Sequence, residues 1–146
     1  MIIRNMLISD YCAVYDLWTK TPGMGLNVSS DSEKGIERFL HRNPNTCFVA
    51  ETDGEIIGAV LSGHDGRRGL IYHMAVKVSE RKRGVGGALL DAVEESLRNE
   101  GIEKLYIMVF KNNESGNAFW EKRGYIVPFE TIYRAKEISR IERIDT

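Results

Sequence analysis

The sequence predicts an α/β (α+β) fold in which about four helices cover both faces of a mixed β-sheet of six to seven strands. Short apolar runs alternate with longer segments whose apolar residues recur every three or four positions, the patterns of strands and of helix faces. An Asp-Gly turn signal at 53–54 predicts a hairpin. Hairpins followed by a helical crossover predict a mixed sheet with helices on both faces.

The first half of the chain is expected to hold three strands and two helices. Ser9 is a plausible N-cap for the first helix, which ends before Pro22, and a glycine-containing loop follows at 21–30. Asn43-Pro44 ends the second helix. The expected strands lie at 1–6, 47–51 and 55–62, and the second helix lies at 31–41.

The second half is expected to hold three strands and two helices. Gly101 and Gly124 are plausible stops for the two helices, because glycine readily takes the left-handed conformation at a helix end. The charged segment 139–146 is expected to form a loose tail or an extra turn. The expected strands lie at 70–78, 103–110 and 131–138, and the helices begin at Val85 and Asn113.

The chain of 146 residues has the size of one ordinary domain, so we expect a single domain over 1–146. Its content of 42% hydrophobic and 28% charged residues is typical of a globular protein, and its net charge of -1 argues against nucleic-acid binding by bulk electrostatics. The N-terminus lacks the apolar region of a signal peptide, and the longest aliphatic run, 56–61, is too short to span a bilayer. We therefore expect a cytoplasmic protein that binds neither nucleic acid nor membrane.

Cys12 and Cys47 are isolated cysteines in unlike contexts, which favours buried free thiols over a disulfide. Together with His41, His64 and His73 they show no metal-ligand spacing, so no metal is expected.

The segment 70–90 predicts an anion-binding site. An apolar strand is followed by the basic, glycine-rich turn 81–87 and then by an amphipathic helix. A turn that opens a helix directs unpaired N–H groups outward, and glycines let a ligand approach the backbone closely. The helix dipole and the cationic side chains then favour a phosphate or pyrophosphate. The simplest alternative is a solvated basic turn before an ordinary helix.

Two common phosphate-binding signatures do not fit this turn. A dinucleotide fingerprint that starts at Gly84 needs glycine at position 89, which is leucine here. A P-loop needs Gly-Lys-Ser or Gly-Lys-Thr, and the chain contains neither. These mismatches weaken the alternative of a nucleotide-binding protein of another fold.

The pattern R-x-x-G-x-G formed by Arg81, Gly84 and Gly86 resembles the acyl-CoA-binding motif of the GNAT superfamily of N-acyltransferases. The resemblance implies a GNAT-like, centrally splayed sheet that opens after the strand 70–78 and holds acetyl-CoA in the cleft. Backbone groups of that strand would orient the thioester, and amides of the turn would hold the CoA pyrophosphate. The implied cofactor-binding residues here are Met74, Ala75, Val76, Arg81, Lys82, Arg83, Gly84, Val85, Gly86 and Gly87.

A second motif, NESGNAFWEKRGY at 113–125, resembles the other hallmark of the family. Asn113, Gly116 and Trp120 lie at i, i+3 and i+7, which places them on one helical face. The resemblance implies that they line the CoA site. As purely structural residues, Asn113 would be a helix N-cap and Trp120 a core residue. HDGRRG at 64–69 and FWEKRGY also resemble a largely uncharacterised bacterial sub-branch of the family, which supplies no substrate.

The catalytic groups depart from the family pattern. Many members carry a Tyr at the place of Trp120 as general acid, whereas an indole N–H donates a hydrogen bond without supplying a proton. The strand 70–78 has no carboxylate to act as general base, which leaves Tyr72 and His73, with Glu51 on a neighbouring strand as another candidate. Alternation places Tyr72 and His73 on opposite faces, so that at most one reaches the cleft, unless a bulge shifts the phase.

The leading hypothesis is an N-acetyltransferase that moves an acetyl group from acetyl-CoA to a primary amine by direct attack in a ternary complex, without an acyl-cysteine. Its catalytic candidates are Tyr72, His73 and Trp120. The acceptor would be a small-molecule amine or a peptide amine, and relatives that pair through their last strands imply that a homodimer could form. The alternative is a non-catalytic acyl-CoA sensor of the same fold, which would bind acyl-CoA and never turn over.

Overall fold

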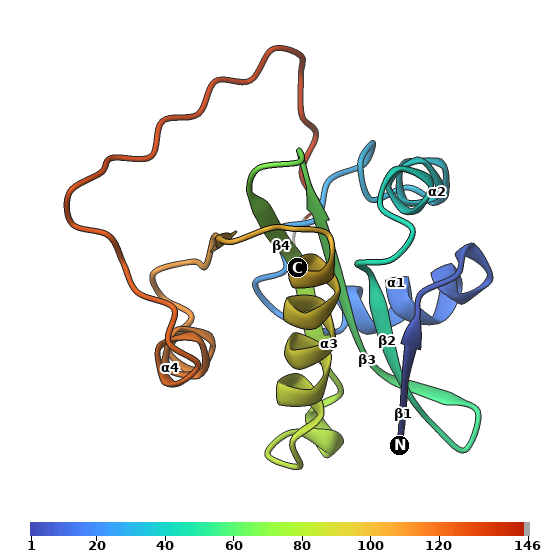
Figure 1. Ribbon diagram of the computed structural model, residues 1–146. Helices are drawn as coiled ribbons and strands as arrows, with labels where there is room; N and C mark the ends of the chain where they lie inside the picture. The colour runs from blue at the N-terminus through green and yellow to red at the C-terminus, as the bar shows by residue number, and fades with distance from the viewer. Residues whose placement is uncertain (145–146) are drawn as a thin grey trace.

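Residues 1–144 are described by a computed structural model in which a five-stranded sheet is flanked by four α-helices (Figure 1). Short 3-10 turns at Ile8–Asp10 and Val78–Glu80 precede the first and third helices. The strands are β1 (Ile2–Asn5), β2 (Phe48–Thr52), β3 (Glu55–His64), β4 (Gly69–Val76) and β5 (Leu105–Ile107), and the helices are α1 (Tyr11–Thr19), α2 (Glu33–Arg42), α3 (Val85–Asn99) and α4 (Glu114–Lys122).

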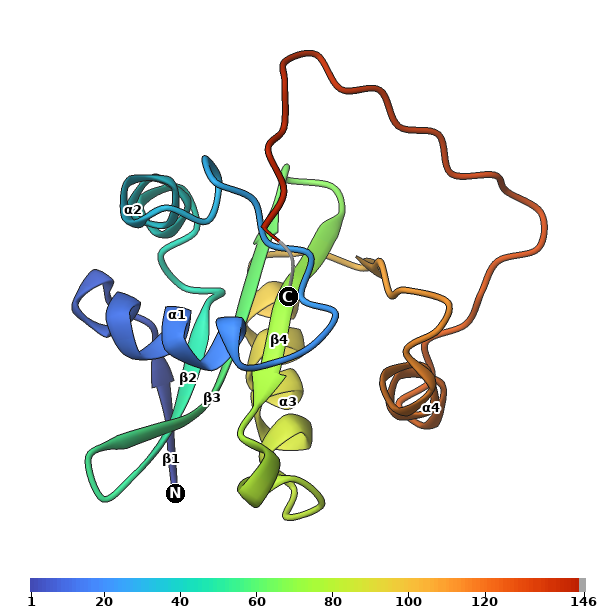
Figure 2. The same cartoon turned by 180° about the vertical axis from the view of Figure 1, so that it is seen from behind.

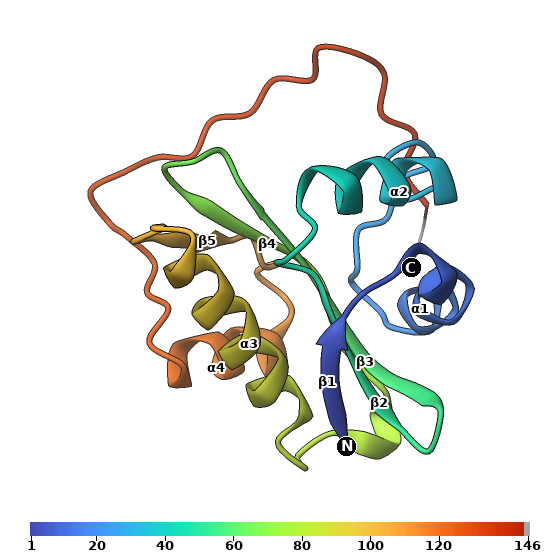
Figure 3. The ribbon, with the colours of Figure 1, turned by 45° about the vertical axis from the view of Figure 1, so that its right-hand side comes forward.

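The strands lie in the order β1-β2-β3-β4-β5, so strands that are consecutive in the chain are neighbours in the sheet. β1 to β4 pair antiparallel, and β5 joins β4 in parallel after the crossover through α3. Figure 3 shows α3 and α4 on one side of the sheet and α1 and α2 on the other. The predicted mixed sheet with helices on both faces is confirmed, with five strands in place of six to seven.

Apolar side chains form one core on each face of the sheet. The first core joins α1, α2 and the loop after α1, and includes the fully buried Trp18 and Leu26. The second joins α3 to the sheet and includes Leu89 and Trp120. Because both cores pack on β3, this strand is buried without interruption from Ile56 to Gly63.

The sheet opens between β4 and β5. These two strands pair at three positions, the last of which places Ile71 opposite Ile107. Beyond this point β4 continues to Val76, whereas residues 108–110 pair with no strand. The strand predicted over 103–110 therefore forms only at its centre, because the opening removes the partner of its end. The parted strands give the centrally splayed sheet that the resemblance implied.

A β-bulge in β4 changes the faces to which its side chains point. The register between β3 and β4 shifts by one residue at Val60, which leaves an extra residue in β4 beside His73. His73 accordingly takes a φ of 21°. Tyr72 and His73 then both lie on the side of α1 and α2, where they pack edge-on against Phe39 and Trp18. The alternation that would place Tyr72 and His73 on opposite faces therefore does not hold, and the bulge left open as the exception shifts the phase.

The strand predicted at 131–138 does not form, and no helix or strand follows α4 in the described part of the chain. The segment after α4 arches away from the sheet and then returns to it (Figure 2). Its apolar side chains are exposed, Ile132 at 79% and Ile138 at 95%. A strand needs a neighbour that satisfies its backbone groups, and no strand of the sheet pairs with this segment.

The charged end of the chain is partly held in place. The Val28 N–H donates to the Glu142 carbonyl, and the Ile144 N–H donates to the Leu26 carbonyl, both at 2.8 Å. The expectation of a loose tail from residue 139 onward therefore fails at 142–144, while Asp145 and Thr146 lie outside the described residues.

The start of α1 differs from the predicted cap. Ser9 lies inside the 3-10 turn, and Asp10 instead accepts a hydrogen bond from the Leu7 N–H at 2.8 Å. Asp10 thereby fixes the turn from which α1 begins.

Candidate functional site

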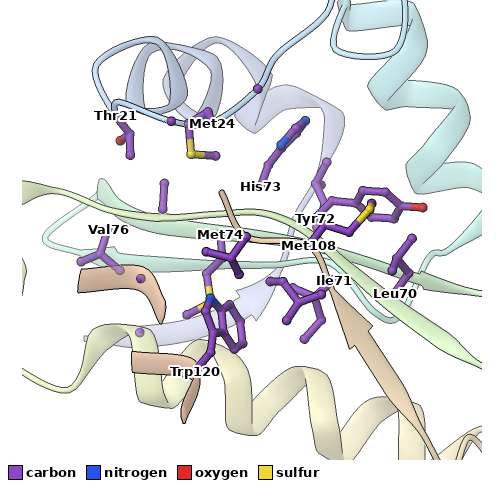
Figure 4. A pocket seen from close by; sticks show the side chains of 18 of the residues that line it. Thr21, Met24, Leu70, Ile71, Tyr72, His73, Met74, Val76, Met108 and Trp120 are labelled. Atoms are coloured by element: carbon purple, nitrogen blue, oxygen red, sulfur yellow. The ribbon is translucent and has the colours of Figure 1, made fainter. Parts of the chain in front are cut away.

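An open cleft of about 2010 Å³ lies where β4 and β5 part. Its walls come from β4, residues 106–110, the turn before α3, the start of α4 and the loop between α1 and α2. Figure 4 shows Met74 and Trp120 on one side of β4, and His73 and Met24 on the other. The splay therefore makes one continuous cleft that passes through the sheet, from the side of α3 and α4 to the side of α1 and α2.

The turn before α3 presents unpaired amides to this cleft. The Ala88 N–H donates to the Gly84 carbonyl at 3.0 Å and so makes the first hydrogen bond of the helix. The N–H groups of residues 85–87 have no acceptor among the described residues, and all three residues line the cleft. Gly84 has a φ of 85° and open space where a Cβ would be, so a ligand can approach the backbone here.

The cationic residues of the turn divide between the cleft and the surface. Arg81 and Lys82 line the cleft, and Nε of Arg81 donates to the Val76 carbonyl at 3.2 Å. Arg83 does not line it, and its guanidinium pairs at 2.7 Å with Glu80, which is part of the cleft wall. Two cations, the unpaired amides and the helix dipole are features that favour an anion at this turn.

Met74, Ala75 and Val76 form the wall of β4 beside the turn, and all three line the cleft. The backbone edge of this stretch that faces away from β3 has no strand partner, because the pairing with β5 ends at Ile71. An extended ligand with amide groups can pair with such an edge as an added strand does.

The start of α4 closes the opposite wall. Asn113 is the N-cap of α4 and accepts a hydrogen bond from the Gly116 N–H at 2.9 Å. A Cβ at position 116 would lie 2.5 Å from Nδ2 of Asn113, so a larger residue there would make the Asn113 side chain shift. Trp120 is 8% exposed and packs edge-on against Phe119 and Tyr125. The cap and core positions expected for Asn113 and Trp120 are confirmed, and both residues also line the cleft together with Gly116.

His73 and Tyr72 line the cleft on the side of α1 and α2. Nε2 of His73 lies 2.7 Å from Oδ1 of Asp31, a residue that is 3% exposed. Burial, with a contribution from Tyr133, raises the pKa of the Tyr72 phenol above its ordinary value of 10.0. Tyr72 therefore stays protonated at neutral pH and can donate a hydrogen bond. Asp31 was not predicted as a site residue, because it lies 42 positions from His73 and no sequence motif links the two residues.

Other candidate residues lie away from the cleft. Glu51 pairs with Arg4 at 2.8 Å, and neither Cys12 nor Cys47 is part of the cleft wall. Within residues 1–144, no group of three or more His, Cys, Asp or Glu side chains is placed to hold a metal ion. The helices of this same part of the chain are all too short or too polar to cross a membrane.

Solved structures share this fold. Ard1 from Thermoplasma volcanium superposes with a TM-score of 0.78 at 21% identity, over 87% of this chain and 83% of that chain. The PaiA N-acetyltransferase from Thermoplasma acidophilum, solved in complex with coenzyme A, superposes with a TM-score of 0.77 at 17% identity, over 87% of this chain and 90% of that chain. At these identities the likeness concerns the fold alone.

Comparisons of sequence identify the family as well as the fold. The model of the acetyltransferase (GNAT) family matches residues 11–125. An acetyltransferase of Pectobacterium atrosepticum is 37% identical over 125 residues, and one of Yersinia enterocolitica is 38% identical over 125 residues; each match covers 86% of this chain and 87% of the relative. Since β4, the glycine turn before α3 and the start of α4 all fall inside the matched region, the chain belongs to the GNAT family of acetyltransferases.

Proposed function

We propose that this protein is an N-acetyltransferase that moves an acetyl group from acetyl-CoA to a primary amine by direct attack in a ternary complex. The observation that carries the proposal is the turn 81–87, where unpaired amides, a helix N-terminus and two cations converge on a cleft that passes through the sheet. A pyrophosphate suits this turn both by charge and by hydrogen bonding.

The residues of the cleft suit the successive parts of acetyl-CoA. The turn would hold the pyrophosphate, and the unpaired edge of β4 at 74–76 would hold the amide-bearing pantetheine arm. Asn113, Gly116 and Trp120 would form the facing wall. When bound, acetyl-CoA supplies an activated acetyl group on a thiolate leaving group. Backbone N–H groups of β4 near the bulge would polarise the thioester carbonyl as an oxyanion hole does.

Transfer in this cleft does not require a general acid at position 120. The Trp120 indole N–H donates a hydrogen bond and keeps its proton at neutral pH. A free thiol has a pKa of about 8.5, so a thiolate is a fair leaving group that solvent can protonate. We therefore assign Trp120 to the wall of the acetyl site and Tyr72, whose phenol stays protonated, to hydrogen-bond donation on the acceptor side.

Binding is tested by thermal unfolding with acetyl-CoA, CoA, ATP and NAD at equal concentrations. A ligand at about 100 times its Kd adds about 2.7 kcal/mol, which raises Tm by about 5 to 10 °C for a chain of this size. We expect this shift with both CoA species and not with ATP or NAD. Gly84→Glu should remove most of it, because the change strains a left-handed position and places a carboxylate at the anion site.

Gly54→Glu is the matched control for that variant. Gly54 has a φ of 79° and open space around its Cβ position, as Gly84 does, but it lies in the turn between β2 and β3 and outside the cleft. The Gly54→Glu variant should have a lower Tm than the wild type, and CoA should raise its Tm by the same amount as in the wild type. A folded protein with no shift for any CoA species would contradict both the enzyme and the sensor.

Release of CoA that depends on an added amine separates the enzyme from the sensor. The panel contains amino acids and acidic peptides as well as polyamines, because Arg38, Arg42 and Arg68 line the cleft on the side of α2. The proposal predicts turnover with at least one class of amine. Binding of acetyl-CoA without release for any amine would instead support the non-catalytic sensor.

A further inference from the structure

His73 is held in one orientation by contacts on two sides. Its ring packs edge-on against the fully buried Trp18, with 5.2 Å between the ring centroids. Its Nε2 lies 2.7 Å from Oδ1 of Asp31, and its side chain is only 15% exposed. The two ring nitrogens therefore have fixed and different surroundings.

The carboxylate of Asp31 determines which nitrogen carries the proton. An ionised carboxylate only accepts hydrogen bonds, so Nε2 of His73 donates to it and the neutral ring has its lone pair on Nδ1. The other oxygen of Asp31, Oδ2, accepts the Asn27 N–H at 2.7 Å. The Tyr11 hydroxyl donates to the backbone carbonyl of Asp31 at 2.9 Å. Asp31 is thus fixed by its own contacts before any substrate arrives.

Nδ1 of His73 remains available to a substrate. It has no hydrogen-bond partner among the described residues, and the buried side-chain polar atoms of residues 1–144 that lack a partner are Trp18 Nε1 and Ser62 Oγ. Nδ1 is therefore accessible from the cleft that His73 lines. Figure 4 places this ring on the side of β4 opposite Trp120, so an acceptor can reach it without crossing the CoA wall.

We propose that His73 is the general base of the acetyl transfer and that Asp31 is its positioning residue. The inference rests on the proposed function, because it assigns the group that takes the proton of the acceptor amine. An alkyl amine, with a pKa of about 10.4, is almost fully protonated at neutral pH, so a base beside the attacking nitrogen accelerates the reaction. The bulge in β4 is what brings His73 to the acceptor side.

The proton transfer balances without a further reactant. An alkylammonium acceptor first loses one proton through Nδ1 to solvent. The neutral nitrogen then bonds to the thioester carbonyl carbon, and the carbon–sulfur bond breaks with its electron pair on sulfur. Nδ1 takes the second proton from the nitrogen and releases it to solvent, and solvent protonates the departing thiolate. The Asp31 carboxylate stabilises the transient imidazolium and holds the tautomer without touching the substrate.

Few other titratable or charged groups surround the ring. Tyr72 lies next to it on β4, Tyr11 on α1 contacts Asp31, and Arg143 of the C-terminal segment lines the same cleft. Burial raises the pKa of both phenols above their ordinary value of 10.0, so neither competes with His73 for the proton at neutral pH.

The tautomer is tested in the free protein by 15N NMR of the histidine rings, with the His73 signals identified by their loss in His73→Gln. We expect the proton of the neutral ring on Nε2. In Asp31→Asn the proton should move to Nδ1, because the amide nitrogen then donates to Nε2 while the amide oxygen still accepts the Asn27 N–H. A wild-type ring protonated on Nδ1 would overturn the proposal, and this result does not depend on knowing the acceptor.

Kinetics with the best amine of the panel test the role in turnover. We expect His73→Gln to lower kcat by about 100- to 1000-fold and Asp31→Asn by about 10- to 100-fold, with little change in the KM for acetyl-CoA. Asp10→Asn, assayed under conditions in which it is folded, is the matched control, since the buried Asp10 carboxylate also accepts a backbone N–H group, that of Leu7 at 2.8 Å, but lies outside the cleft and has no histidine partner. This control should keep the wild-type kcat.

The outcomes separate this proposal from the proposed function. Full kcat in His73→Gln would overturn the base assignment and leave acetyl transfer intact, and full kcat in Asp31→Asn would overturn the positioning role. If Asp31→Asn does not fold, the kcat of His73→Gln and the tautomer of the wild-type ring still show whether His73 is the base. A wild-type protein that acetylates no amine contradicts the proposed function itself, and the base assignment falls with it.

Discussion

The two cysteines have opposite environments, and neither contributes to the cleft wall. Cys47 is buried immediately before β2, its Sγ lies 3.3 Å from the Ser62 carbonyl, and burial raises the pKa of its thiol to about 11. The expectation of a buried thiol is wrong for Cys12, which is exposed on α1. A thiol that carries an acyl group must reach the thioester as a thiolate, so neither residue suits that role and direct attack by the amine is the simpler chemistry.

This contrast predicts selective labelling. At pH 8 a thiol with a pKa of about 11 is ionised in about one molecule in a thousand, against about one in four for an ordinary thiol. We expect iodoacetamide to label the folded protein once, at Cys12, and the unfolded protein twice, as read by mass spectrometry. Labelled protein should still release CoA at the wild-type rate. Loss of activity after a single label would indicate that Cys12 has a functional role.

At the scale of elements, an ion-pair cluster ties β1 to the turn that opens α1. The guanidinium of Arg4 bonds both oxygens of Asp10, at 2.8 and 2.9 Å, and it also pairs with Glu51 of β2. The same carboxylate of Asp10 accepts the Leu7 N–H. The Arg4 hydrogen bonds, which outweigh the opposing effect of burial, lower the pKa of Asp10 below its ordinary value of 3.8.

Asp10→Asn should therefore destabilise the fold in a pH-dependent way. A carboxyl group whose pKa is lower in the folded state contributes stability above its unfolded pKa and loses it as pH falls through the folded pKa. We expect a loss of about 1 to 3 kcal/mol at pH 7 by urea unfolding, and a difference from wild type that shrinks below about pH 4. Asp16→Asn, which removes an exposed pair with Lys20, should cost less than about 0.5 kcal/mol. Equal losses for the two variants would refute a special role for Asp10.

Sequence patterns located the elements of this molecule better than the contacts between them. The helices and the turn 81–87 are contiguous features, so periodicity and glycine spacing were sufficient to predict them. The prediction of a strand at 131–138 was wrong because a strand depends on a partner strand, which a local sequence pattern does not reveal. The direction of His73 depends on a one-residue register shift against β3, and its contact with Asp31 exists only in three dimensions.

At the scale of the whole molecule, the splayed sheet gives the cleft two chemically different ends. The end beside α3 carries Arg81, Lys82 and the unpaired amides, and the end beside α1 and α2 carries His73 and Asp31. Under the proposed function, the two substrates would enter from opposite faces of the sheet and meet at the gap between β4 and β5. This arrangement suits a ternary complex better than a sequence of covalent intermediates.

The segment after α4 is the least covered part of the molecule. Its apolar side chains Ile126, Val127, Phe129, Ile132 and Ile138 are between 79% and 95% exposed, far more than a monomer usually leaves in a contiguous stretch. In the sheet described here, β5 pairs only with β4, so its outer edge is unpaired. An unpaired strand edge and an exposed, extended segment that carries Ile132, Tyr133 and Ile138 are complementary, and a second copy of the chain offers both.

We therefore expect a homodimer in which each 131–138 segment covers the β5 edge of its partner. Light scattering on a sizing column should give twice the 16.6 kDa of one chain at micromolar concentration. The double variant Ile132→Glu and Ile138→Glu should shift the protein to the monomer, because it places carboxylates in the buried contact. Leu7→Glu, at a residue that is 58% exposed at the other end of the chain, should leave the dimer intact. A wild-type protein that stays monomeric at every concentration would mean that this segment finds its partner within its own chain.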